Sequence, residues 1–310
     1  MTQRLAALGE GDVLQLLRGP GLTLQLPPFV ARLTSDIPRV AIDLLRLYGD
    51  FELGDVDDFA DFHLAVSHDR GLHAVWRRLA GRRQARFSTD GLAAFTTLPA
   101  QQAFHMVEWG LNWAVTAHAH HFVVYHAAVL ERGGRALVLP APPGSGKSTL
   151  TAALAHRGWR LLSDELALLD AREGMLYGLA RPVNLKNQAI PLMRAFAPDA
   201  VMTEPVPDTL KGTLSLMKAP ADAIARVREG ARPAWVVVPS YEAGATAYLE
   251  PLPKAQAHLL LADQAFNYDI HGVNGFEATA DLVDGASCWA FTYASLDDAV
   301  RVFDELAAAP

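Results

Sequence analysis

The sequence contains a single cysteine, Cys288, among its 310 residues. One cysteine excludes an intramolecular disulfide and a zinc cluster built on cysteines. Because Cys288 lies in the apolar stretch ASCWAFTY, we expect it on a buried strand, as an inert core thiol. Long apolar runs are missing as well. The most apolar region, residues 109–130, is interrupted by an asparagine and four histidines, so no membrane-spanning helix is expected.

An excess of positive charge is also absent. The chain has 27 lysine and arginine residues against 34 aspartate and glutamate residues, a net charge of −7. This balance does not favour binding to nucleic acid or to an anionic membrane. The N-terminus, MTQRLAALGEGDVLQLL, lacks the basic start, the apolar run and the cleavage site of a signal peptide. We therefore expect a globular, cytoplasmic protein.

Two regions differ in their patterns. Residues 1–98 combine strand-like and helix-like segments without a chemical motif, which predicts a smaller mixed α+β region with an accessory or docking role. In residues 99–310 strands and helices alternate, which predicts an α/β domain. The elements expected there include a long helix from Pro99, a strand hairpin around Gly133 and Gly134, a helix from Lys147 to Gly158 and a tight loop over residues 266–277.

The stretch APPGSGKST, residues 141–149, fits the Walker A pattern of a P-loop, with Ala141 where glycine is commoner. It follows the apolar strand RALVLPA and opens the helix STLTAALAHRG. Gly144 and Gly146 allow the backbone to curl around a phosphate. The helix that begins near Lys147 directs its positive end at the anion. The pattern therefore predicts a nucleotide-binding site.

The residues of this loop are assigned roles by their positions in the pattern. Lys147 is expected to reach the β- and γ-phosphates, the Ser148 hydroxyl to bind Mg²⁺, and Thr149 to contact the α-phosphate. The rest of the expected nucleotide-binding set is Pro143, Gly144, Ser145 and Gly146.

An Asp-Glu pair, Asp164 and Glu165, follows Lys147 by 17 and 18 residues. We expect it at the end of a strand that lies beside the loop strand, where open α/β sheets bind ligands. A carboxylate there can hold Mg²⁺ or accept a proton from an attacking hydroxyl. Asp164 is accordingly a candidate metal ligand. The alternative is a turn with two solvated acids.

These residues resemble the catalytic domain of the HPr kinase/phosphorylase family, and within it the bacterial HprK-related kinase A group. His126, in YHAAVL, precedes Lys147 by 21 residues, like the family's histidine on the strand ahead of its loop. HRGWRLLSDELALL is similar to the family's KRGHRLVADDxVxI, with Asp164 and Glu165 where the family has two aspartates. The segments RPVNLKN, LKGTLSLMKAP, VVVPSYEAGA and AFNYDIHGVNGF also resemble the group, so the resemblance covers about residues 100–306.

The resemblance implies ATP-dependent phosphorylation of a hydroxyl, serine above all, on a peptide or small protein, with ATP and Mg²⁺ as cofactors. It also implies self-association. One of the two acids, Asp164 or Glu165, would be the catalytic base, and His126 would contact the γ-phosphate. Considered without the resemblance, His126 is typical of an ordinary buried histidine at a strand end.

One segment departs from the family pattern. Where the family has a glycine-rich segment with a metal-binding glutamate, this chain has ARPVNLKNQAI, which contains no carboxylate. This difference argues against the family's dephosphorylating activity. The candidates for phosphate contacts in the segment are Arg181, Lys186 and Asn187, of which Lys186 is assigned a catalytic role.

A second class of function also fits the motif. A P-loop ATPase or nucleotide switch, which controls a partner without phosphorylating it, would use the same loop and acids around an ordered water molecule. No sensor or arginine-finger pattern of the oligomeric ATPases is evident in the sequence. The kinase is therefore the favoured interpretation.

Overall fold

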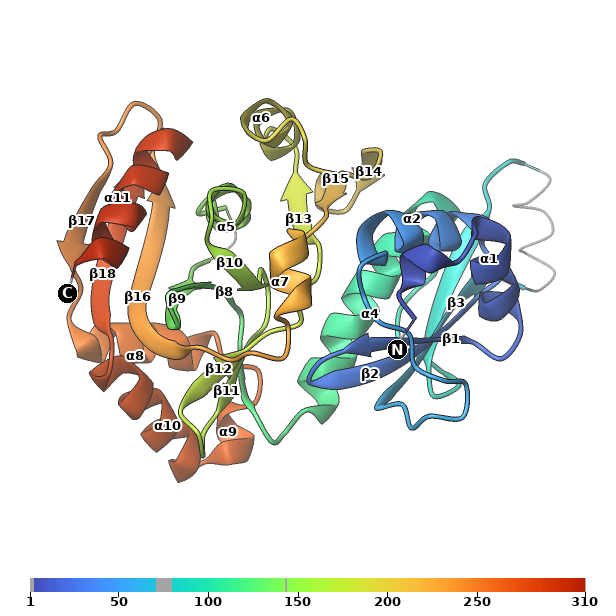
Figure 1. Cartoon of the computed structure of the whole chain (residues 1–310), viewed down its shortest axis with the longest axis horizontal. Helices are drawn as coiled ribbons and strands as arrows, with labels where there is room; N and C mark the ends of the chain where they lie inside the picture. The colour runs from blue at the N-terminus through green and yellow to red at the C-terminus, as the bar shows by residue number, and fades with distance from the viewer. Residues whose placement is uncertain (1–2, 71–79, 143, 310) are drawn as a thin grey trace. The chain divides into compact units, whose positions relative to one another are not determined.

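The computed structural model describes residues 3–70, 80–142 and 144–309. It is a mixed α/β fold with several sheets, in agreement with the expected fold class (Figure 1). The chain forms two compact units, and each is described by itself. The first unit comprises Met1–Ala117 and Val201–Lys218, and the second comprises His118–Ala200 and Ala219–Pro310.

This division differs from the expected boundary between residues 98 and 99, because helix α4 (Ala103–His118) packs in the first unit against α2 (Pro38–Tyr48). The Tyr48 hydroxyl donates a hydrogen bond to Glu108 Oε1 at 2.6 Å, and the ring of Phe104 lies 6.3 Å from that of Tyr48. The later segment Val201–Lys218 returns to the same unit, where Lys218 Nζ pairs with Asp50 Oδ2 at 2.7 Å.

The first unit is built on a sheet of order β1-β2-β3-β4-β5, with β6 paired to β4. Strands β2 and β3 are parallel, and the other pairs are antiparallel. Alternate side chains of β2 are buried, which is the pattern of a sheet with one face on a core. The elements are η1 Leu5–Ala7, α1 Glu10–Arg18, β1 Leu22–Leu26, β2 Phe29–Ser35, α2, β3 Phe62–His68, β4 Gln84–Thr89, β5 Leu92–Ala93, β6 Leu98–Pro99, η2 Ala100–Gln102, α4, β14 Val206–Thr209 and β15 Gly212–Met217.

The second unit alternates strands and helices through most of its length. Its elements are β7 Val123–Tyr125, β8 Ala127–Arg132, β9 Arg135–Pro140, α5 Lys147–Ala155, β10 Arg160–Ser163, β11 Ala167–Asp170, β12 Met175–Tyr177, β13 Val183–Lys186, α6 Ala189–Phe196, α7 Ala221–Ala225, β16 Arg232–Tyr241, β17 Tyr248–Pro251, α8 Lys254–Asp263, α9 Tyr268–His271, α10 Val273–Asp284, β18 Ser287–Tyr293 and α11 Leu296–Ala308. The predicted hairpin around Gly133 and Gly134 and the predicted helix from Lys147 are both confirmed.

The main sheet of the second unit has the order β10-β8-β9-β16-β18-β17. The expectation that the strand before Asp164 lies beside the loop strand β9 is wrong, because the tight β8–β9 hairpin places β8 between them. Strand β8 is antiparallel to both neighbours, so β10 and β9 still run in the same direction. Their carboxyl ends, and that of β16, which is parallel to β9, therefore lie at one edge of the sheet.

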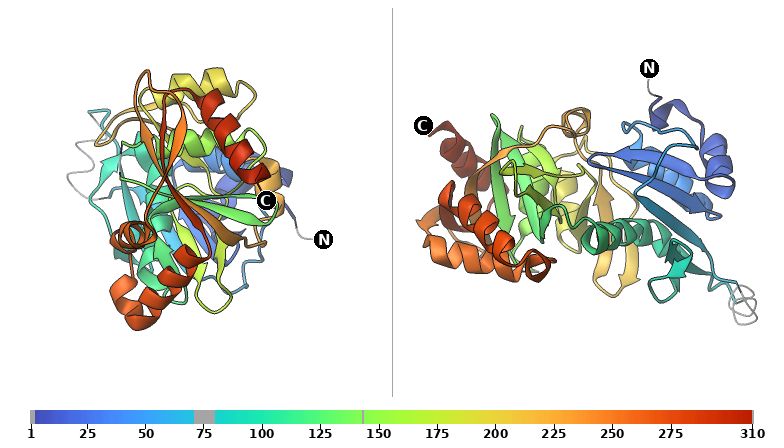
Figure 2. Two further views of the ribbon diagram at one scale, coloured as in Figure 1. Left: turned by 90° about the vertical axis from the view of Figure 1, so that its left-hand side faces the viewer. Right: turned by 90° about the horizontal axis from the view of Figure 1, so that it is seen from below.

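Both faces of this sheet are covered. Alternate residues such as Val129, Val138 and Cys288 pack with α8 and α10 in one apolar cluster. On the other face Phe303 of α11 contacts Trp159 and Phe291, at ring-centroid distances of 6.2 and 4.9 Å. Figure 2 shows α8 and α10 packed together and β16 and β18 side by side. The result is a layered α/β unit with a continuous core.

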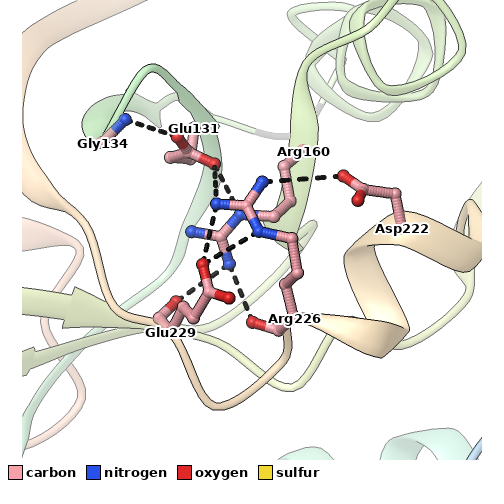
Figure 3. A network of polar contacts seen from close by, with 6 residues as sticks. All are labelled: Glu131, Gly134, Arg160, Asp222, Arg226 and Glu229. Atoms are coloured by element: carbon pink, nitrogen blue, oxygen red, sulfur yellow. Dashed lines mark hydrogen bonds and ion pairs between the residues drawn. The ribbon is translucent and has the colours of Figure 1, made fainter.

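A buried ion pair joins the β8–β9 hairpin to β10 (Figure 3). Arg160 Nε donates to Glu131 Oε2 at 2.5 Å, and both side chains are 3% exposed. Glu131 Oε1 also accepts the N–H of Gly134, and Arg160 donates to the backbone carbonyls of Arg226 and Glu229. The pair therefore joins three backbone segments that lie far apart in the sequence.

Two further expectations can be checked against the fold. Cys288 is buried on β18, as predicted, and burial raises the pKa of its thiol. Residues 266–277 are not a tight loop, because they contain α9 and the start of α10, with Gly272 between them at φ +55°. In the part of the chain that the structure describes, no helix has the length and apolar character needed to cross a membrane.

Candidate functional site

The segment between β9 and α5, residues 141–146, is called here the glycine loop. Gly144 and Gly146 adopt φ angles of +92° and +87°, which L side chains rarely adopt. A Cβ at Gly146 would also lie 2.4 Å from the Tyr293 hydroxyl oxygen. The loop closes with a hydrogen bond from Ser145 N–H to Pro142 O at 3.4 Å. Of the predicted loop residues, Pro143 lies outside the described part of the chain.

Lys147 is the first residue of α5, and its side chain is buried. Its ammonium nitrogen has no hydrogen-bond partner. Burial lowers the pKa of Lys147, the charges of Asp164 and Glu165 act to raise it, and that of Lys186 acts to lower it. A buried cation without a partner is energetically costly, so this position fits an anionic ligand.

Asp164 follows β10 and is buried, and its charge acts to raise the pKa of Lys147. Burial raises the pKa of Asp164 to about 6, although the charge of Lys147 acts to lower it. The Ser148 hydroxyl hydrogen-bonds to its side chain, and Asn184 N–H donates to Oδ2 at 3.4 Å. Its other oxygen, Oδ1, has no partner. A carboxylate oxygen and a hydroxyl held together in this way fit a hard cation such as Mg²⁺.

Asn184 is a site residue that the sequence analysis missed. It lies on β13, it is 7% exposed, and its Oδ1 has no hydrogen-bond partner. The signal was present in RPVNLKN, because residues 184 and 186 are two apart on one strand and so share a face. The residues of this segment that are predicted to contact phosphates are Arg181, Lys186 and Asn187, and Asn184 is not among them.

The unpartnered buried atoms are concentrated at this point of the fold. In the described residues, seven buried side-chain nitrogen or oxygen atoms have no hydrogen-bond partner. Four of them belong to Ser145, Lys147, Asp164 and Asn184. Buried polar atoms in native proteins are normally paired, so a group of unpaired ones around a glycine loop indicates a ligand site.

Glu165 and Lys186, two further predicted residues, act electrostatically on this group. Glu165 is half-buried, its N–H donates to Ser163 Oγ at 3.3 Å, and its charge acts on both Lys147 and Asp164. Lys186 ends β13 and also acts on Lys147. The structure therefore brings Lys147, Ser148, Asp164, Glu165 and Lys186 together.

His126 and Thr149 are two further residues that are predicted to contact phosphate groups. His126 N–H donates to Gln264 O at 2.7 Å, and its ring lies 6.0 Å from that of Phe266. A contact between His126 and a phosphate group stays a prediction. Thr149 lies in the first turn of α5 and is half-buried, and its predicted phosphate contact likewise stays a prediction. Arg181 is buried just before β13, and Asn187 follows that strand at φ +48°.

Metal binding at this site would need phosphate oxygens as well as protein ligands. Over the described ranges, no three or more His, Cys, Asp or Glu side chains are grouped so that they could hold a metal ion by themselves. Ser148 and Asp164 would supply only two ligands. This set fits Mg²⁺, which is commonly held by one or two protein groups and the phosphates of a substrate.

Comparisons with known proteins give little further information. No family model and no curated protein matches the chain. The solved structure of the Hpr(Ser) kinase/phosphatase from Coxiella burnetii is similar to it, with 11% sequence identity over 59% of this chain and 96% of that chain. The TM-score of that match is 0.25, so it carries no argument about function.

Proposed function

We propose that the protein is an ATP-dependent kinase that transfers the γ-phosphate to a serine hydroxyl of a peptide or small protein. The observation that carries the proposal is the group of unpartnered buried atoms on Lys147, Asp164 and Asn184 beside the glycine loop. A cation, a carboxylate oxygen and an amide oxygen are the groups that a nucleoside triphosphate with its Mg²⁺ would engage.

Charge neutralisation is the first task of such a site. Lys147 Nζ would bind the β- and γ-phosphates, together with the N–H groups of the glycine loop and the first turn of α5. Mg²⁺, held by Ser148 and Asp164, would offset charge on the same phosphates. Lys186 lies close enough to lower the pKa of Lys147, so it would add a second positive charge.

Acceptor activation is the second task. Asp164 is buried and hydrogen-bonded to Ser148, the other proposed metal ligand, which supports a role for Asp164 in holding Mg²⁺. Glu165 is the next residue and is half-buried, which supports access to an acceptor hydroxyl. We therefore assign Glu165 as the group that orients the hydroxyl and takes its proton, and Asp164 as the metal ligand.

Transfer of labelled phosphate tests the proposal. Purified protein with Mg²⁺ and γ-labelled ATP would be incubated with peptide and small-protein fractions of the host, beside Lys147→Ala and Asp164→Ala. We expect a labelled polypeptide with the wild type and none with either variant. Free labelled phosphate, with no labelled polypeptide, would instead support an ATPase or nucleotide switch.

A further inference from the structure

Tyr241 is an exposed aromatic residue in contact with the glycine loop. It is the last residue of β16, which runs parallel to the loop strand β9, so it ends at the same edge of the sheet. Its N–H donates to Ser145 O at 3.1 Å, and its Cβ lies 3.1 Å from the position of a Cβ on Gly146. Even so, 52% of Tyr241 is exposed to solvent.

The ring of Tyr241 rests on a row of buried aromatic side chains. It meets Tyr293 edge to face, with 5.7 Å between centroids and an interplanar angle of 75°. Tyr293 in turn stacks on Phe291 at 5.3 Å and 7°, and its hydroxyl donates to Gly146 O at 3.1 Å. Tyr293 and Phe291 are each 1% exposed. This support restricts the motion of the Tyr241 ring, while much of the residue stays open to solvent.

The order of the strands places the acidic residues on one side of the glycine loop and Tyr241 on the other, so the phosphate end and the base end of a bound nucleotide would meet different side chains. Asp164 and Glu165 follow β10, on one side of the loop strand β9, and Tyr241 ends β16, on the other side. Three charged side chains influence the pKa of Lys147, and none of them lies on β16. They are Asp164 and Glu165, which follow β10, and Lys186, which ends β13. The terminal phosphate therefore belongs on the β10 side, which leaves the β16 side for the nucleoside.

We propose that Tyr241 is the stacking platform for the purine base of the nucleotide. This inference rests on the proposed function, because it takes the glycine loop as the phosphate site. An aromatic ring stacks on any base and does not read its hydrogen-bonding edge. ATP and GTP therefore bind with similar affinities, and both bind more tightly than tripolyphosphate, which has the phosphates but no base.

Calorimetric titration of the full-length protein tests the inference. Mg·ATP and Mg·tripolyphosphate would be titrated into the wild type, Tyr241→Ala, Tyr241→Phe and a control, Tyr248→Ala, which removes another half-exposed tyrosine from β17. We expect Tyr241→Ala to weaken ATP binding about tenfold, the scale of one base–aromatic stack, and to leave tripolyphosphate binding within twofold. Tyr241→Phe and the control should bind both ligands like the wild type.

Two results would overturn the base platform while leaving the kinase proposal standing. The first is ATP binding by Tyr241→Ala that equals the wild type. The second is an equal loss of affinity for ATP and for tripolyphosphate in Tyr241→Ala, which would mean that the ring only shapes the loop. Failure of the wild type to bind either ligand would instead overturn the phosphate site, and with it the kinase proposal and this inference.

Discussion

The backbone N–H of Asn184 donates a hydrogen bond to Asp164 Oδ2 at 3.4 Å, between residues 20 apart in the chain. This contact links the start of β13 to the end of β10. It occupies one oxygen of Asp164 and leaves Oδ1 of both Asp164 and Asn184 without a partner. Two unpaired oxygens of this kind, beside a buried lysine, are the central feature of the proposed phosphate site.

Replacement of Asn184 tests whether its side chain belongs to the site. Asn184→Ala keeps the backbone N–H that Asp164 accepts but removes the unpartnered amide oxygen. We expect phosphate transfer to fall about tenfold, the loss that accompanies one hydrogen bond of roughly 1.4 kcal/mol. Steady-state rates of phosphate transfer at several Mg²⁺ concentrations measure this fall. Asn274→Ala, at an exposed position on α10, is the matched control and should match the wild type. Equal activity of Asn184→Ala and the control would remove Asn184 from the site.

The raised pKa of Asp164 predicts how stability depends on pH. Burial raises it to about 6, against an ordinary value near 4, so the folded state holds this proton more tightly than the unfolded state. The resulting stabilisation is complete below about pH 4 and is lost as the pH rises through about 6. Over that range the wild type should lose about 3 kcal/mol relative to Asp164→Asn, which has no proton to release. Urea unfolding of both proteins from pH 4 to pH 8 measures the difference in their unfolding free energies. The same dependence on pH in both proteins would contradict the prediction.

Gly146 should be the most sensitive glycine of the loop. An alanine there meets both an unfavourable φ of +87° and the Tyr293 hydroxyl oxygen at 2.4 Å, whereas alanine at Gly144 meets only the unfavourable φ. We expect Gly146→Ala to lower ATP affinity more than tenfold and Gly144→Ala to lower it less. Gly174→Ala, at φ +63° in the β11–β12 turn, controls for backbone strain and should bind ATP normally. Binding titrations compare the three, and the reverse order at the two loop glycines would contradict the geometry.

The Glu131–Arg160 pair should matter to stability and not to phosphate chemistry. Both side chains are 3% exposed, so Glu131→Ala leaves the Arg160 charge buried without its carboxylate, and Arg160→Ala leaves Glu131 with only the longer ion pair to Arg226, at 3.6 Å. Each change should cost about 3 kcal/mol of unfolding free energy. The double variant should lose clearly less than the sum of the two single losses. Chemical denaturation of the four proteins measures the coupling, and simple additivity would show that the two charges act independently.

Much of the second unit could be predicted from local sequence. The Gly133-Gly134 turn between two apolar runs predicted the β8–β9 hairpin, and the loop pattern followed by apolar helical spacing predicted α5. Both depend on short-range rules of turns and periodicity, which a single sequence contains. The buried position of Cys288 followed from its apolar surroundings in the same way.

The wrong predictions concern features that depend on contacts between residues far apart in the sequence. The place of β10 next to β8 depends on which strand edge remains open after the hairpin forms, and no local pattern fixes that. The glycines of residues 266–277 indicated a loop, yet only Gly272 adopts a positive φ, while Gly275 is buried within α10. Asn184 was missed because its role comes from Asp164, which is 20 residues away in sequence.

Thermal unfolding with and without Mg·ATP tests the central claim most directly, because it asks whether the buried polar group around Lys147 binds a nucleotide. At a ligand concentration of about one hundred times Kd, we expect ATP to stabilise the wild type by about 2.7 kcal/mol, seen as a higher midpoint. Lys147→Met, which keeps an unbranched side chain but loses the charge, should fold and show no shift with ATP. An unshifted wild type, or an equal shift in Lys147→Met, would contradict the account.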